Sequence, residues 1–309
     1  MFRFRSALGI VCGLLLLAAC ETPRDFNAYQ SAITQFQQAT DTTATIALRY
    51  VGDINKFEQD YEFKLLEQDP TRELNLLKLM SPAFSPEAIR ARAQAFSVLK
   101  QYTQMLSELA GSDAADRWKA ATERAKTSAD TLLKNMSEKT DVLDKLPIAN
   151  IASPLKTLVD VIATEIINAK RAAALDAAIA KAAPAIQKIS AGLKEDLAFV
   201  VRQRTSVGIL NLSALQIQYQ TAREAGNTGK RLQILKKVRK ALTSWSETEE
   251  TLQGLMHVMD RFDAAHDALI KYARSDKGPQ NTSDLVTIVR HYADLAKTVF
   301  DDFKALGST

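Results

Sequence analysis

Residues 26–61 read "FNAYQSAITQFQQATDTTATIALRYVGDINKFEQDY" and place an apolar or threonine side chain at every third or fourth position without a break. This 3.5-residue repeat is typical of helices that wrap around their neighbours along a continuous seam. We therefore predict a helix with an aromatic-rich stripe in the core, and a looser contact at mid-length, where two threonines fall. The seam positions are Phe26, Tyr29, Ile33, Phe36, Thr40, Thr43, Ala47, Tyr50, Ile54, Phe57 and Tyr61.

The ends of this helix are also readable from the sequence. Asp25 is a good N-cap residue, and Pro70 disfavours helical backbone in the residue before it, so we expect a helix from about residue 25 to 68. About 44 residues at 1.5 Å each make a rod of about 65 Å. A rod of that length does not fit a compact globule, so the pattern predicts an elongated molecule.

The rest of the chain is helical in character as well. Its 309 residues include only 11 Gly and 8 Pro, which cluster between periodic segments, and few segments alternate with a period of two. The fold class we expect is all-α: an elongated bundle of six to eight antiparallel helices, several about 40 residues long, with coiled-coil-like seams. Besides the first, we expect helices over residues 71–80 and 86–110, one from residue 113 to a break around Pro147, and one from residue 154 into the alanine-rich run that contains Pro184. Two more follow over residues 185–225 and 230–274, and a last one is capped by Thr282 or Ser283.

Two of these helices have matched lengths and are joined by "AGNTG", residues 225–229. The short connection predicts an antiparallel hairpin of about 60 Å. Pro184 precedes the first arm, inside an alanine-rich run, and it either kinks one continuous helix or separates two. We expect one elongated helical domain over residues 26–309, with residue 184 as the position of any kink.

The amino-terminal segment has a different composition. It begins "MFRFRSALGIVCGLLLLAAC", with Arg3 and Arg5 before residues 7–19, which carry no charge. That apolar run is shorter than the roughly 20 residues that a membrane-spanning helix needs, and it matches the apolar region of a secretory signal. Leu17-Ala18-Ala19-Cys20 resembles the lipobox of bacterial lipoproteins.

The resemblance implies a lipid-anchored protein. Residues 1–19 would be a cleaved signal peptide, and Cys20 would carry a diacylglyceryl group on sulfur and an acyl group on its freed amine. Residues 20–25 would be the lipidated cysteine and a short tether. The chain would then lie in the cell envelope on the periplasmic side. Glu21 stands where an aspartate would favour the inner membrane, so the outer membrane is favoured.

The net charge of the chain does not indicate a class of binding partner. The chain holds 40 basic and 36 acidic residues, and the signal removes two of the basic ones, which leaves about +2. Such a balance, in an envelope compartment, argues against nucleic acid as a partner. Apart from the covalent lipid on Cys20, we expect no cofactor.

One stretch of the second hairpin arm, residues 229–240, is strongly basic and contains no acid. Cations in the first turn oppose the helix dipole, so the cluster does not serve helix stability. It is either a solvated helix face or a binding surface for an anionic partner such as lipid headgroups or an acidic protein face. Alternating helices would put it far from the lipid, which favours a protein. The residues are Lys230, Arg231, Lys236, Lys237, Arg239 and Lys240.

Catalytic motifs are sparse. "MDRFDAAHDAL", residues 259–269, gives Asp263 and His266 the i, i+3 spacing of di-iron bundles, with Asp260 and Asp267 nearby, but it has no second copy. His266 also continues an apolar seam, so it is either a metal ligand or a histidine at the edge of the core. The chain has no Gly-x-Ser-x-Gly motif and no glycine-rich phosphate loop. We expect no enzyme.

Two functions from different classes remain. The first is a non-catalytic helical scaffold or protein-binding module, anchored in the cell envelope, whose partner is an envelope protein or another copy of itself. The alternative is a carrier that holds an apolar ligand or lipid within the bundle, which would require a cavity of several hundred Å³. A cleft where acids, lysines or His266 converge would instead indicate an enzyme.

Overall fold

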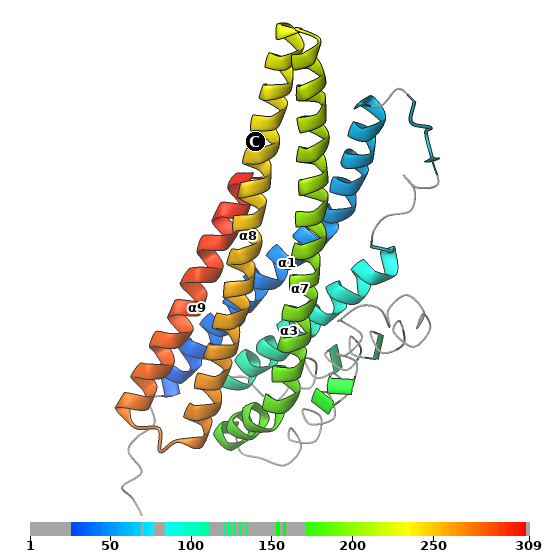
Figure 1. The fold of residues 1–309 in the computed structure, drawn as a ribbon. Helices are drawn as coiled ribbons and strands as arrows, with labels where there is room; N and C mark the ends of the chain where they lie inside the picture. Colours follow the sequence, from blue (N-terminus) through cyan, green and yellow to red (C-terminus); the bar gives the residue numbers. More distant parts are fainter. Residues whose placement is uncertain are drawn as a thin grey trace, which may run out of the picture.

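The protein is all-α, as predicted. The computed structural model describes residues 26–68, 71–76, 84–111 and 171–306, with isolated positions between 120 and 158, and these residues include no strand. Residues 1–25, with the predicted signal, Cys20 and tether, lie outside the described part of the chain, as does much of the two helices predicted to begin at residues 113 and 154. The helices with described bounds are α1 (Phe26–Gln68), α3 (Pro86–Ala110), α7 (Arg171–Glu224), α8 (Thr228–Arg274) and α9 (Pro279–Leu306) (Figure 1).

The seam of α1 packs in the core, as its period predicts. Tyr29, Ile33 and Phe36 are fully buried, and the Phe36 ring lies 5.2 Å from the ring of Phe262 in α8. Burying one such side chain contributes about 1.5–3 kcal/mol, so a row of them fixes the helix against its neighbours.

The two threonines in the seam contradict the expected loose contact. Thr40 and Thr43 are buried, and their hydroxyls donate to the carbonyls of the preceding helical turn at 2.8 and 2.7 Å. Their oxygens also lie 3.3 and 3.0 Å from the hydroxyl of Tyr292 in α9. Because every hydroxyl in this layer has a partner, the layer can be buried at little cost and the seam stays closed.

Helices that follow one another in the described chain run antiparallel, but α1 and α9 lie side by side in parallel (Figure 1). Thr43 contacts Tyr292, and Arg49, further along α1, lies over the ring of Phe303, further along α9. The reason is geometric: α1 and α9 both pack antiparallel to α8, so they must run parallel to each other.

The α7–α8 hairpin forms as predicted, but its first arm is longer. α7 runs without interruption through Pro184 for 54 residues, so the proline separates nothing. Pro184 is exposed, so its ring lies on the solvent-facing side of the helix. In the turn, Gly226 adopts φ +66° and the Asn227 side chain accepts from the amide of Lys230 at 2.9 Å, which caps α8.

Three helix boundaries test the remaining predictions. Ser85 caps α3 by accepting from the amide of Ala88 at 3.1 Å, as its Ser-Pro signal predicts. The predicted helix over 71–80 is wrong at residues 71–75, which are turn and irregular backbone, whereas residue 76 is helical and residues 77–80 lie outside the described part of the chain. α9 begins at Pro279 and not at the predicted caps, since proline is well suited to the first helical turn. Among the described residues, no helix is both long and apolar enough to cross a membrane.

Candidate functional site

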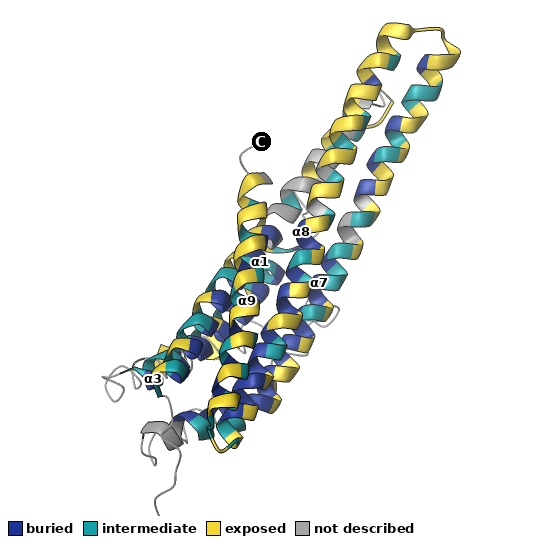
Figure 2. Ribbon diagram, turned by 90° about the vertical axis from the view of Figure 1, so that its left-hand side faces the viewer, coloured by how far each residue is buried: buried dark blue, intermediate teal, exposed yellow. Residues whose placement is uncertain are grey.

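The far part of the α7–α8 hairpin projects beyond the rest of the bundle (Figures 1 and 2). We call residues 208–245 the distal hairpin. The opposite end, the root, is where α1 begins: the Tyr29 hydroxyl donates to Asp176 near the start of α7 at 3.1 Å, and the Tyr29 ring lies 4.5 Å from that of Tyr272 near the end of α8. About 45 residues of α8 separate Tyr272 from the turn, so the two ends are about 68 Å apart.

A small core of its own holds the distal hairpin together. Leu215, Ala222 and Ile234 are buried there, apart from the main core of the bundle. The arms approach closely where Gly208 faces Trp245, because a Cβ at residue 208 would lie 2.7 Å from Cδ1 of the indole. The hairpin is therefore a closely packed arm with a thin core.

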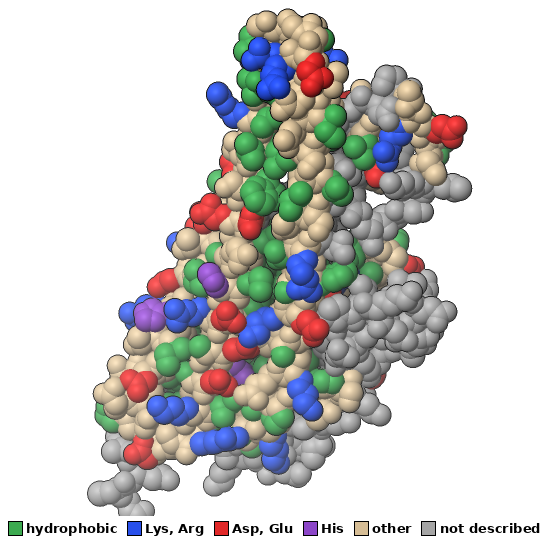
Figure 3. Space-filling model, in the orientation of Figure 1, with side chains coloured by type: hydrophobic (Ala, Val, Ile, Leu, Met, Phe, Trp, Pro, Cys, Tyr) green, Lys and Arg blue, Asp and Glu red, His purple; other side chains and the backbone are tan. Residues whose placement is uncertain are grey.

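Large apolar side chains remain exposed on this arm. On α8, Leu232, Leu235 and Leu242 are 57%, 44% and 44% exposed, and spacings of three and seven place them on one helix face. On α7, Ile209, Leu210 and Ile217 are also exposed. Figure 3 shows hydrophobic side chains along the projecting hairpin and basic ones near its end. A group of exposed apolar residues often marks a surface that binds a partner.

The predicted basic cluster lies on the same arm, and one member differs from the rest. Lys230, Lys236, Lys237, Arg239 and Lys240 are exposed, and none of them forms an ion pair within the described part of the chain. Arg231 is half-buried: its Nη2 donates to the Tyr219 hydroxyl at 3.3 Å, and its guanidinium lies over the Tyr219 ring. Arg231 therefore closes the hairpin, and the other five face solvent.

The residues of the suspected metal motif do not converge. Asp260 and Asp263 pair with Lys194 of α7 at 3.1 and 2.7 Å, and Asp267 accepts from Gln187 at 3.2 Å. His266 instead points into the core. Within the described ranges, no group of three or more histidine, cysteine or acidic residues could hold a metal ion.

The environment of His266 is that of a core residue. Its Nε2 lies 2.9 Å from the Tyr102 hydroxyl, and its ring stacks on those of Phe36 and Phe262. Burial lowers the pKa of His266 to about 3 and raises that of Tyr102. The imidazole is therefore neutral at physiological pH. The rings of Phe36, Tyr102 and Phe262 pack against it.

A buried ion pair between α3 and α7 was missed by the sequence analysis. The Arg92 guanidinium donates to both carboxylate oxygens of Asp196, at 2.7 and 2.8 Å, and lies 4.2 Å from the centre of the Phe84 ring. Both side chains are buried. The sequence signal for this pair is the position of Arg92, which falls at seam spacing between Ile89 and Phe96. The pair is fully engaged and has a structural role.

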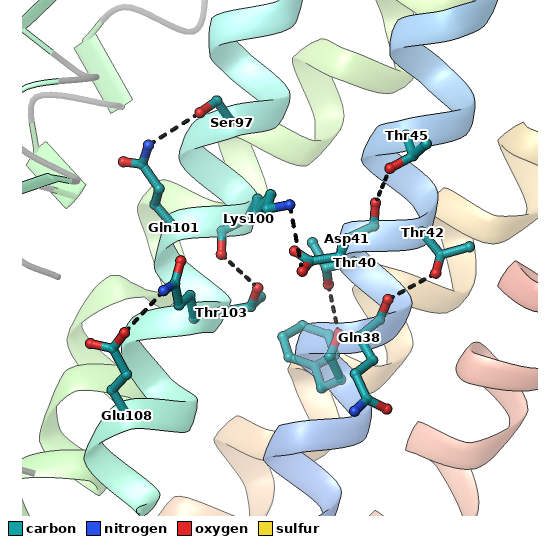
Figure 4. A network of polar contacts seen from close by, with 12 residues as sticks. Gln38, Thr40, Asp41, Thr42, Thr45, Ser97, Lys100, Gln101, Thr103 and Glu108 are labelled. Atoms are coloured by element: carbon teal, nitrogen blue, oxygen red, sulfur yellow. Dashed lines mark hydrogen bonds and ion pairs between the residues drawn. The ribbon is translucent and has the colours of Figure 1, made fainter. Parts of the chain in front are cut away.

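The interface between α1 and α3 has a row of polar contacts along its edge (Figure 4). Asp41 lies 3.6 Å from the Lys100 amine, and the pKa of Asp41 is raised by burial, against the attraction of Lys100. Thr42 and Thr45 donate to carbonyls of their own helix, and Gln104 donates to Glu108 at 3.0 Å. The groups are spread along the helices and do not converge on a point where a substrate could react.

A pocket of about 200 Å³ lies between α8 and α9 near the root, lined by Lys271, Tyr272, Asn281, Asp284 and Leu285 among others. Sites for small organic ligands are commonly 300–1,000 Å³, so this one is small for the predicted carrier function.

No protein-family model, curated protein or solved structure matches the chain. The distal hairpin is thus the candidate site on its own geometry: it is exposed, partly apolar, basic, and opposite the root.

Proposed function

We propose that the protein is a membrane-anchored lipoprotein of the cell envelope that acts as a non-catalytic helical scaffold and binds a protein partner through its distal hairpin. The observation that supports this is the separation of the two ends. The root is at the start of α1, six residues after Cys20 in the sequence, whereas the exposed leucines and cations of α8 lie between residues 230 and 242, about 45–63 Å from Tyr272 along the helix.

The root is suited to a rigid attachment. Lys277, in the loop after α8, lies 3.5 Å from Asp176 and over the Tyr272 ring, and its amine contacts the last carbonyls of α8. Asp176 also accepts from Tyr29. These contacts tie the start of α1, the start of α7 and the end of α8 together, so a load on the hairpin would be transmitted to the anchored end.

A non-catalytic role is supported by how the titratable groups are used. Arg92 and Asp196 form an ion pair with each other, and Asp260 and Asp263 both pair with Lys194. His266 is packed against aromatic rings. Reactive groups at an active site need access to a substrate. The distal hairpin, by contrast, presents exposed leucines, isoleucines and cations to solvent.

The anchor is tested by fractionation of cells expressing the wild type and Cys20→Ser. The wild type is expected in the membrane fraction and Cys20→Ser in the soluble fraction. Cys12→Ser is the matched control, because Cys12 falls in the predicted signal and should leave membrane attachment unchanged. A Cys20→Ser chain that still fractionates with membranes would refute the lipid anchor.

The binding arm is tested with a photo-crosslinking amino acid at residue 235, and at residue 188 as a control. Leu235 lies on the distal hairpin, whereas Lys188 is exposed on α7 near the root. We expect protein adducts from position 235 and few from 188. Equal labelling at both positions, or none at 235, would contradict the assignment of the hairpin as the binding arm.

A further inference from the structure

α8 carries a second seam, distinct from the one that faces α7. Leu232, Leu235 and Leu242 belong to a run of positions spaced three and four apart that continues past them. Every position in the run is exposed or half-buried, so no described helix covers it. The second seam comprises four apolar residues, three of them leucines near the turn, and four polar ones: Leu232, Leu235, Arg239, Leu242, Ser246, Glu249, Gln253 and Met256.

The neighbouring helix leaves this face uncovered. α9 packs on α8 through Val299, whose Cγ2 would lie 3.0 Å from a Cβ at Gly254. Ser246 and Gln253, on the second seam near that level, remain exposed. An uncovered 3.5-residue repeat on a rigid helix is suited to packing against another helix.

Charge along α8 is divided into two blocks. Residues 230–240 contain six cations and no acid, and residues 241–260 contain four acids, among them Glu247, Glu249 and Glu250, and no lysine or arginine. A parallel pair of α8 helices would oppose like charges. In an antiparallel pair, the basic block of each helix would lie opposite the acidic block of the other.

We infer that the occupant of the second seam is a second copy of this chain, with the two α8 helices antiparallel about a two-fold axis. This inference rests on the proposed function, in which the distal hairpin is the binding arm. Antiparallel seams pair their alternating positions, and one register opposes Arg239 to Glu249 of the other copy. In the same register Leu232 opposes Met256 of the other copy, Leu235 opposes Gln253, and Leu242 opposes Ser246 beside the axis.

The pairing leaves both roots free. The axis falls near residue 244, about 28 residues of α8 from Tyr272, so the two roots lie about 85 Å apart at opposite ends of the pair. Each hairpin gains two helices as neighbours, which covers the leucines that α8 exposes beside its thin core. The two-helix arm becomes part of a four-helix bundle.

The experiment uses the mature chain, residues 20–309, with Cys20→Ser so that lipid plays no part. Sedimentation equilibrium is measured up to about 100 μM for this chain and for its Arg239→Glu and Glu249→Arg variants. The parent is expected to dimerise, and each reversal is expected to weaken the dimer by about 10- to 30-fold, since it affects two symmetric pairs. Arg239→Lys keeps the charge and should retain the dimer. Circular dichroism checks that every variant is folded.

Mixing the two reversed variants is the decisive measurement. In a mixed pair, the acid introduced at position 239 of one copy faces the base introduced at position 249 of the other. The native Arg239 and Glu249 face each other at the second contact, so both contacts are complementary and dimerisation should return. A mixture no stronger than the separate variants would overturn the inference, as would a parent dimer that neither reversal weakens.

Two other outcomes bear on the inference. A parent that stays monomeric, or that binds vesicles of anionic phospholipid instead of itself, would also overturn it. If position 235 still crosslinks a different envelope protein, the proposed function stands without this partner.

Discussion

Acid should unfold this protein partly through His266. Its imidazole is fully buried among Phe36, Phe262 and Tyr102, where a positive charge would be poorly solvated, and burial lowers its pKa from 6.5 to about 3. In the unfolded chain the ring is in water and titrates near 6.5. Between those two values the unfolded state binds a proton that the native state does not, so stability falls as the pH falls.

The size of the effect follows from the pKa difference. Each pH unit inside the window from 6.5 down to about 3 removes about 1.4 kcal/mol of the free energy of unfolding. At pH 5 the loss is about 2 kcal/mol, relative to pH 7.5. Asp41 acts in the opposite direction, because burial raises its pKa and its native carboxyl takes up a proton more readily than the unfolded one.

Urea unfolding of the mature chain at pH 7.5 and pH 5 measures the effect. The free energy of unfolding should fall by about 2 kcal/mol more in the wild type than in His266→Gln, whose side chain keeps hydrogen-bonding groups near Tyr102 but does not titrate. Taking the difference between the two chains removes Asp41 and the other carboxyls. His257→Gln is the matched control, because His257 is exposed. If His266→Gln lost as much stability with acid as the wild type, the reasoning from burial would be refuted.

Two further predictions concern packing. Arg92→Leu should lower the free energy of unfolding by about 3–5 kcal/mol, because it leaves Asp196 buried and unpaired, and adding Asp196→Leu should recover a large part of it; a double variant as unstable as the single one in urea would contradict this. Gly208→Ala should speed amide hydrogen exchange throughout the distal hairpin, because a Cβ at 208 would meet Trp245 at 2.7 Å. Gly52→Ala, where a Cβ meets nothing within 4 Å, should instead stabilise α1 by about 0.5–1 kcal/mol, and equal effects of the two substitutions would argue against close packing at 208.

The distal hairpin was only partly visible in the sequence. Its turn, its arms and its basic block could be read from local patterns, because glycine, capping residues and charge runs act over a few positions. Sequence alone places Arg231 among the surface cations, whereas it closes the hairpin on Tyr219. On the second seam of α8, the leucines at 232, 235 and 242 could not be told from core residues by their spacing, and only the packing of the other helices shows that they are exposed.

Local sequence patterns were sufficient for most of the secondary structure and for the length of the rod. α1 ends at Gln68, and α8 begins within two residues of the predicted start and ends at Arg274 as expected, because periodicity and helix stop signals are local. The lipid on Cys20 is likewise a prediction from the sequence.

Everything that depends on which helices meet came from the tertiary structure. Arg92 finds Asp196 across 104 positions of sequence and Tyr102 finds His266 across 164, and no local pattern encodes such pairs. The parallel packing of α1 and α9, and the buried threonine layer that joins Thr43 to Tyr292, have the same origin. Burial sets the cost of a charge or a hydroxyl, and burial is a property of the assembled bundle. That is why the chain's polar chemistry, unlike its helices, could be assigned only from the structure.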